Sequence, residues 1–101
     1  MKESSHVKAM SDKITVRVTV SGEVQGVGFR AFTLQNAVSA GVKGWVENKP
    51  SGDVHAVLSG DEESVRKVLG AMKQGPIMSS VDDMDMERTT YLAFDGFSIH
   101  R

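Results

Sequence analysis

The sequence predicts an α+β domain in which two helices cover one face of a mostly antiparallel sheet. Apolar residues recur with strand and helix periods in the order strand, helix, strand, strand, helix, strand. A turn-rich segment, 49–53, separates the two middle strands and indicates a hairpin. With 101 residues, 40% of them hydrophobic, the chain suits one domain with a single modest core.

The first half of the chain predicts a strand, a helix and a second strand. Residues 14–21, ITVRVTVS, alternate between apolar and polar side chains, as in a half-buried strand. The segment FRAFTLQNAVSA (29–40) consists of helix formers and apolar residues, and Gly41 stands where helices usually end. VKGWVEN (42–48) then predicts the second strand.

The second half predicts a third strand over 54–60, VHAVLSG, which the turn at 49–53 makes an antiparallel neighbour of the second. Acidic residues 61–63 stand where a helix N-terminus favours them, and Gly75-Pro76 ends the helix. Between these limits an apolar stripe at helical spacing is formed by Val65, Val68, Leu69 and Met72.

The C-terminal part predicts an irregular edge strand over 80–88 and a short extra strand over 96–100. The edge strand contains four acidic residues, Asp82, Asp83, Asp85 and Glu87. Strand alternation would send them to both faces, so a solvated edge is favoured over a metal site. The complete order, βαββαβ with an extra C-terminal strand, is typical of the ferredoxin-like sandwich.

Composition excludes several classes of function. The formal net charge of -1 gives no strong positive field for nucleic acid or membranes, and the absence of cysteine excludes thiolate chemistry. No apolar run approaches the roughly 18 residues of a membrane span, and residues 1–13 lack the apolar core of a signal peptide. We therefore expect a cytoplasmic protein with a mobile leader over 1–13 and one domain over 14–101.

The most informative segment is GEVQGVGFR (22–30), which lies between the first strand and the first helix. Backbone N–H groups and the positive end of the helix dipole form an anion site there, and glycines let an oxyanion approach the backbone. Arg30 adds a forked, permanently charged donor that suits phosphate. On the local pattern alone, a phosphate-binding loop and a glycine-rich turn with a solvent-facing Arg30 stay equally open.

The same segment formally matches the dinucleotide fingerprint G-x-G-x-x-A over 26–31, and Glu47 follows at the end of the next strand. That fold requires a parallel sheet with a second crossover helix, whereas 49–53 reverses the chain. An RNA-recognition domain shares the element order, but its central strands would need stacking aromatics, which ITVRVTV and VHAVLS lack. Both alternatives are therefore set aside.

Two motifs together resemble the acylphosphatase family. GEVQGVGFR matches the family segment G-x-V-Q-G-V-G-F-R, and GWVENKPSGDV (44–54) matches G-W-V-x-N-x-x-x-G-x-V. The resemblance extends over residues 14–101, with Lys49 and Ser51 differing from the residues that are common in the family. It implies the ferredoxin-like fold and hydrolysis of the carboxyl–phosphate bond in acyl phosphates, without metal or cofactor.

The resemblance also implies roles for individual residues. Arg30 matches the phosphate-binding arginine of the family, and Asn48 matches the asparagine that positions the attacking water. The phosphate cradle corresponds to the backbone of Gln25, Gly26, Val27, Gly28, Phe29 and Arg30. The implied partners are a small acyl phosphate and inorganic phosphate as product and inhibitor, and we expect a monomer.

One rival function remains open at this point. Acylphosphatase-like domains also occur inside larger carbamoyl-phosphate-handling enzymes, so the alternative hypothesis is a phosphate-binding module without turnover. The three histidines, at 6, 55 and 100, are dispersed and indicate no histidine-based mechanism.

Overall fold

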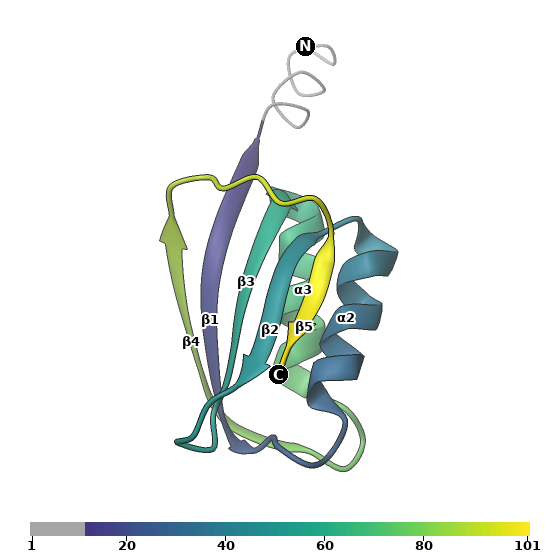
Figure 1. Ribbon diagram of the computed structural model, residues 1–101, viewed down its shortest axis with the longest axis vertical. Coiled ribbons are helices and arrows are strands. Elements are labelled where there is room, and N and C mark those ends of the chain that lie inside the picture. Colours follow the sequence, from purple (N-terminus) through teal and green to yellow (C-terminus); the bar gives the residue numbers. More distant parts are fainter. Residues whose placement is uncertain (1–11) are drawn as a thin grey trace.

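The computed structural model of the protein describes residues 12–101 and confirms the predicted fold (Figure 1). The strands are β1 (Lys13–Glu23), β2 (Lys43–Asn48), β3 (Val54–Asp61), β4 (Ser80–Thr89) and β5 (Phe97–His100). The helices are α2 (Phe29–Ala40) and α3 (Glu62–Gln74). Among the described residues, neither helix is long and apolar enough to cross a membrane.

The strands form one five-stranded sheet in the order β4-β1-β3-β2-β5. β1 pairs antiparallel with β3 and β4, β2 pairs antiparallel with β3, and the extra strand β5 runs parallel to β2. Both helices lie on the same face of this sheet (Figure 1). The arrangement is the ferredoxin-like sandwich with a short C-terminal strand, and β4 lies at an edge as predicted.

The boundaries differ from prediction mainly at β1. Apolar alternation stops at Ser21, but pairing with β4 continues to Glu23 across a register shift between Ser21 and Gly22. At the other end β1 begins at Lys13, and the carbonyl of Asp12 accepts a hydrogen bond from the backbone N–H of Glu62 (3.0 Å). The rest of the expected mobile leader, residues 1–11, lies outside the described residues.

The core fills the space between the sheet and the helices. On β1 the buried side chains that point to the helices are Ile14, Val16, Val18 and Val20. The predicted apolar stripe of α3 is confirmed, because Val65, Val68 and Met72 are buried and Leu69 is partly buried beside them. From α2, Phe29 and Ala37 join this core. Burial of these side chains fixes which face each strand turns toward the helices.

The connection between β4 and β5 covers part of the other face. The backbone N–H of Leu92 donates to Oγ1 of Thr15 (2.8 Å). The hydroxyls of Thr15 and Ser59, both buried, are hydrogen-bonded at 2.5 Å. These bonds satisfy the polar side chains that β1 and β3 bury on this side of the sheet.

Gly44 is the position where the sheet most strictly requires glycine. Its φ is 135°, and a Cβ atom there would overlap the carbonyl oxygen of Val57 on β3. We expect Gly44→Ala to lower the free energy of unfolding by about 2 to 4 kcal/mol, measured by urea denaturation. Gly70 on α3 is the matched control, because no atom lies within 4 Å of its Cβ position. Gly70→Ala should raise stability by about 0.5 to 1 kcal/mol. Equal effects of the two substitutions would contradict this explanation.

Candidate active site

Three chain segments meet at the lower end of the sheet in Figure 1: the β1–α2 loop, the β2–β3 hairpin and the C-terminal end of β5. A cavity of about 210 Å³ lies where they come together. Its lining consists of Val24, Gly26, Gly28, Phe29, Arg30, Ala31, Asn48, Ile99 and Arg101. The structure thus brings five of the predicted site residues to one cavity, whereas the lining does not include Gln25 or Val27.

The β1–α2 loop exposes its backbone N–H groups. Gly26 (φ 76°) and Gly28 (φ 79°) both adopt the left-handed conformation, which favours glycine, and no atom crowds either Cβ position. Within residues 12–101, the N–H groups of residues 25–28 donate no hydrogen bond to a protein acceptor. Successive free N–H groups of this kind are the donors from which concave anion sites are built in proteins.

The start of α2 adds to this positive potential. The N–H groups of its first turn have no partner within the helix, and no acidic residue stands in that turn to neutralise the helix dipole. Phe29 is buried in the core and fixes where the helix begins, while Val27 packs partly buried against the same core. The side chains of Val27 and Phe29 therefore anchor this segment to the core, and the backbone groups of the two residues form the surface of the loop.

Arg30 brings a guanidinium group to the cavity. Its Nη1 donates to the carbonyl oxygen of His100 at 3.2 Å. In the described part of the chain no carboxylate pairs with it, and no acidic side chain lines the cavity. The remaining donors of the guanidinium fork and its full charge are thus available to an anion.

Asn48, the last residue of β2, presents an unpaired acceptor. Its Oδ1 is buried, and no described residue donates a hydrogen bond to it. A buried acceptor without a donor costs about 1 to 3 kcal/mol. Asn48 also lines the cavity, so its amide lies close to the space beside Arg30.

Gln25 serves the site through its side chain, a role that the sequence did not predict. Its Nε2 donates to the carbonyl oxygens of Lys49 (2.8 Å) and Asp53 (2.9 Å). Both carbonyls belong to the hairpin that follows Asn48, so one amide ties this hairpin to the β1–α2 loop. The bonds span 24 and 28 residues, and no local pattern in the sequence signals such pairs.

The two hairpin residues that differ from the common family residues make contacts inside the hairpin region. Nζ of Lys49 lies 3.3 Å from Oε2 of Glu47, and Oγ of Ser51 accepts a bond from the backbone N–H of Asp53 (3.4 Å). The lining of the cavity includes neither side chain. Four lining residues were missed by the sequence. Val24 and Ala31 flank the predicted cradle, whereas Ile99 and Arg101 belong to or follow β5, whose place depends on its pairing with β2.

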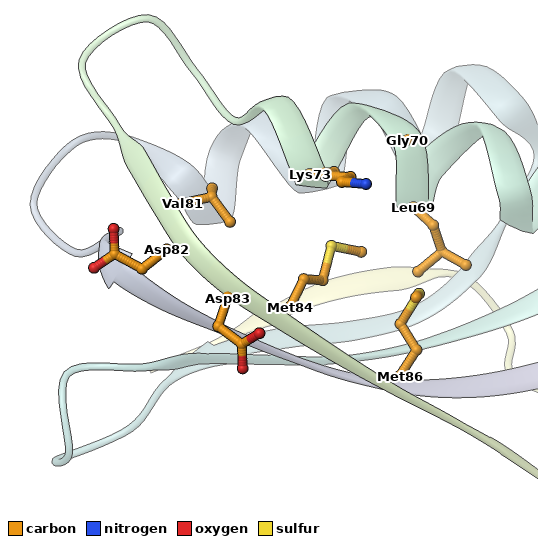
Figure 2. A pocket seen from close by; sticks show the side chains of 8 residues that line it. All are labelled: Leu69, Gly70, Lys73, Val81, Asp82, Asp83, Met84 and Met86. Carbon is orange, nitrogen blue, oxygen red and sulfur yellow. The ribbon is translucent and has the colours of Figure 1, made fainter.

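A larger groove, of about 470 Å³, lies between α3 and β4 (Figure 2). Leu69, Met84 and Met86 form an apolar cluster there, and Figure 2 shows Asp82 at one end of the groove and the carboxylate of Asp83 pointing away from α3. The groove thus combines an apolar cluster with charges of both signs, because Lys73 also lines it. The acidic residues of β4 are all exposed on this edge strand, as predicted, and they take no part in the cavity beside Arg30.

Fold and cavity together define a ferredoxin-like protein in which a glycine loop, Arg30 and Asn48 border one cavity. A family model described as Acylphosphatase matches residues 16–99. The chain is 48% identical over 86 residues to the Acylphosphatase of Methanothrix thermoacetophila, covering 85% of this chain and 96% of that protein. The chain therefore belongs to the acylphosphatase family.

Solved structures place the same fold in two settings. An acylphosphatase from Coxiella burnetii matches with a TM-score of 0.85 and 30% identity, covering 88% of this chain and 94% of that one. Full-length HypF in the phosphate- and nucleotide-bound form matches with a TM-score of 0.83 and 26% identity, covering 89% of this chain but 12% of that one. The fold thus occurs both alone and within a much longer chain.

The Gln25 contacts give a test of how the site is held together. We expect Gln25→Leu to remove two hydrogen bonds and lower the free energy of unfolding by about 1 to 2 kcal/mol. Amide hydrogen exchange at Lys49 and Gly52, whose N–H groups close the hairpin, should accelerate more than exchange in α3. Gln35→Leu on the exposed side of α2 is the control. Unchanged exchange in the hairpin would show that Gln25 does not hold it.

Proposed function

We propose that the protein hydrolyses the carboxyl–phosphate bond of small acyl phosphates to a carboxylate and inorganic phosphate. The observation that carries this proposal is the unpaired, buried Oδ1 of Asn48, which shares a cavity with Arg30 and the glycine loop. Family membership supports the same reaction.

The phosphoryl group binds to the loop between β1 and α2. Free N–H groups of residues 25–30 and the guanidinium of Arg30 surround its oxygens, and the positive end of α2 points at the same place. Negative charge spreads over the equatorial oxygens during phosphoryl transfer. These fixed donors follow that charge into the transition state without reorganising, which is the main source of rate.

Asn48 positions the nucleophile. Its Oδ1 accepts a hydrogen bond from water, but a neutral amide does not remove the proton. The water oxygen forms a bond to phosphorus while the bond from phosphorus to the acyl oxygen breaks, and the electron pair leaves with the carboxylate. The proton of the water passes to an oxygen of the phosphate. Because a carboxylate departs readily from this mixed anhydride, positioning supplies most of what the reaction needs.

We propose that this reaction needs no metal and no cofactor. The described lining offers N–H groups, guanidinium groups and an amide, which are ligands for an anion, and it contains no acidic side chain to bind a divalent cation. We also propose that the working unit is a monomer. Inorganic phosphate should occupy the same loop and inhibit.

A phosphate-binding module without turnover is the second candidate, and the match to a small part of HypF favours it. Such a module needs the loop and Arg30, but it has no use for an unpaired amide oxygen beside them. Asn48 therefore separates the two functions.

The first test measures hydrolysis of benzoyl phosphate with a chelator present. We expect chelator-resistant turnover that inorganic phosphate inhibits, and Asn48→Ala should lower kcat by about 10²-fold or more while the affinity for inorganic phosphate is retained. Asn36→Ala is the control, because among the described residues its amide bonds to the carbonyl of Phe32 within α2. Phosphate binding without wild-type turnover would assign the chain to the binding module. Parallel losses of rate and affinity in Asn48→Ala would make Asn48 a binding residue.

Arg30→Ala should lower both kcat and the affinity for inorganic phosphate. We expect kcat to fall by about 10²-fold or more, the usual effect of removing one anion-stabilising donor, together with the affinity for phosphate. Arg30→Lys keeps the charge but not the fork, so it should recover affinity better than rate. Arg66→Ala, which removes an exposed arginine paired with Glu62 on α3, is the control for lost charge. Near-normal rates in Arg30→Ala would overturn the mechanism.

A further inference from the structure

The backbone carbonyl of His100, which accepts a hydrogen bond from Arg30, belongs to the weakly held strand β5. β5 has four residues, lies at the sheet edge and pairs only with β2. Phe97 and Ile99 pack against the core, but His100 is exposed and stands at the end of the strand. Short terminal strands of this kind fray. Yet Nη1 of Arg30 donates to the carbonyl oxygen of His100, so fraying of residue 100 would release Arg30.

The ring of His100 is held from the opposite face of the sheet. It stacks on Trp45 of β2 with ring centroids 4.9 Å apart and planes 16° from parallel. Its Nδ1 lies 3.9 Å from Oε1 of Glu47, whose other oxygen lies 3.3 Å from Nζ of Lys49. Val46, between Trp45 and Glu47, is fully buried toward the helices, so the stack lies on the face that the helices leave open.

We propose that Trp45 and His100 are positioning residues for Arg30. The stack fixes the imidazole, the imidazole fixes the backbone of residue 100, and the carbonyl of that residue holds one nitrogen of the guanidinium. Arg30 then meets the phosphate with its remaining donors already oriented, which reduces the conformational freedom lost on binding. This inference rests on the proposed function for its kinetic consequences, but it applies to phosphate binding whether or not the chain has turnover.

The coupling should work in both directions. If the stack improves phosphate binding through Arg30, phosphate must stabilise the stack by the same factor. Trp45 is the only tryptophan of the sequence, so its fluorescence reports directly on the stacked ring. Inorganic phosphate should therefore change the fluorescence emission of Trp45, even though Trp45 is not among the residues that line the cavity beside Arg30.

The experiment compares wild type with His100→Ala, His100→Phe, Trp45→Leu and His55→Ala. His55 is the matched control, because it is the other histidine of residues 12–101 and pairs with Glu47 across β2 and β3. The dissociation constant for inorganic phosphate is measured by calorimetry, and kcat and KM are measured with benzoyl phosphate. Thermal unfolding checks that each variant is folded at the assay temperature.

We expect His100→Ala to weaken phosphate binding by about three- to tenfold, in line with the contribution of one aromatic pair. His100→Phe keeps a stacking ring and should recover affinity to within about twofold. His55→Ala should match wild type, and Trp45→Leu should repeat the loss from the other side of the stack. Unchanged affinity in His100→Ala, or an equal loss in His100→Phe, would overturn the proposal. Absent turnover in the wild type would instead contradict the proposed function, and the phosphate affinities would still decide this inference.

Discussion

The site depends on the register at one residue, Val54 at the start of β3. Val54 is fully buried, and it pairs with Val20 of β1 on one side and with Asn48 of β2 on the other. This double pairing places the end of β1, from which the glycine loop departs, two strands away from Asn48. It also turns the Asn48 side chain toward the helices, where the cavity lies. A slip by one residue would send that amide to the opposite face. Packing of Val54 therefore sets the geometry on which Arg30 and Asn48 rely.

Prediction from the sequence succeeded where the signal is local. Alternation located β1 and the hairpin, helical spacing located α3, and the two motifs selected Arg30 and Asn48 as candidates whose roles remain predictions. Contacts between distant segments gave no signal. The amide of Gln25 reaches carbonyls 24 and 28 residues away, and His100 meets Arg30 across 70 residues. Such contacts exist only after β5 has paired with β2 and the β2–β3 hairpin has formed. Periodicity within a segment therefore does not predict them.

Charge is distributed unevenly across a chain whose formal net charge is only -1. The acidic residues of β4 lie at one edge of the sheet, while Arg30 and Arg101 line the cavity beside β5, the strand at the other edge. An arginine attracts an anion most strongly when no carboxylate nearby offsets its positive charge. The described cavity lining contains no acidic side chain. A local positive site thus exists without an overall basic surface, which favours a small anion over a polyanion.

The buried oxygen of Asn48 is a local cost to the stability of this fold. An unpaired acceptor lowers the stability of the folded chain, and an apolar side chain at the end of β2 would avoid that penalty. Under the proposed function, water or a ligand would supply the missing donor during turnover. The bonds made by Gln25 and by the carbonyl of His100 act in the opposite direction, because they stabilise the loop, the hairpin and Arg30 around this acceptor. The surrounding contacts therefore hold open a cavity whose central polar group is left free to bind.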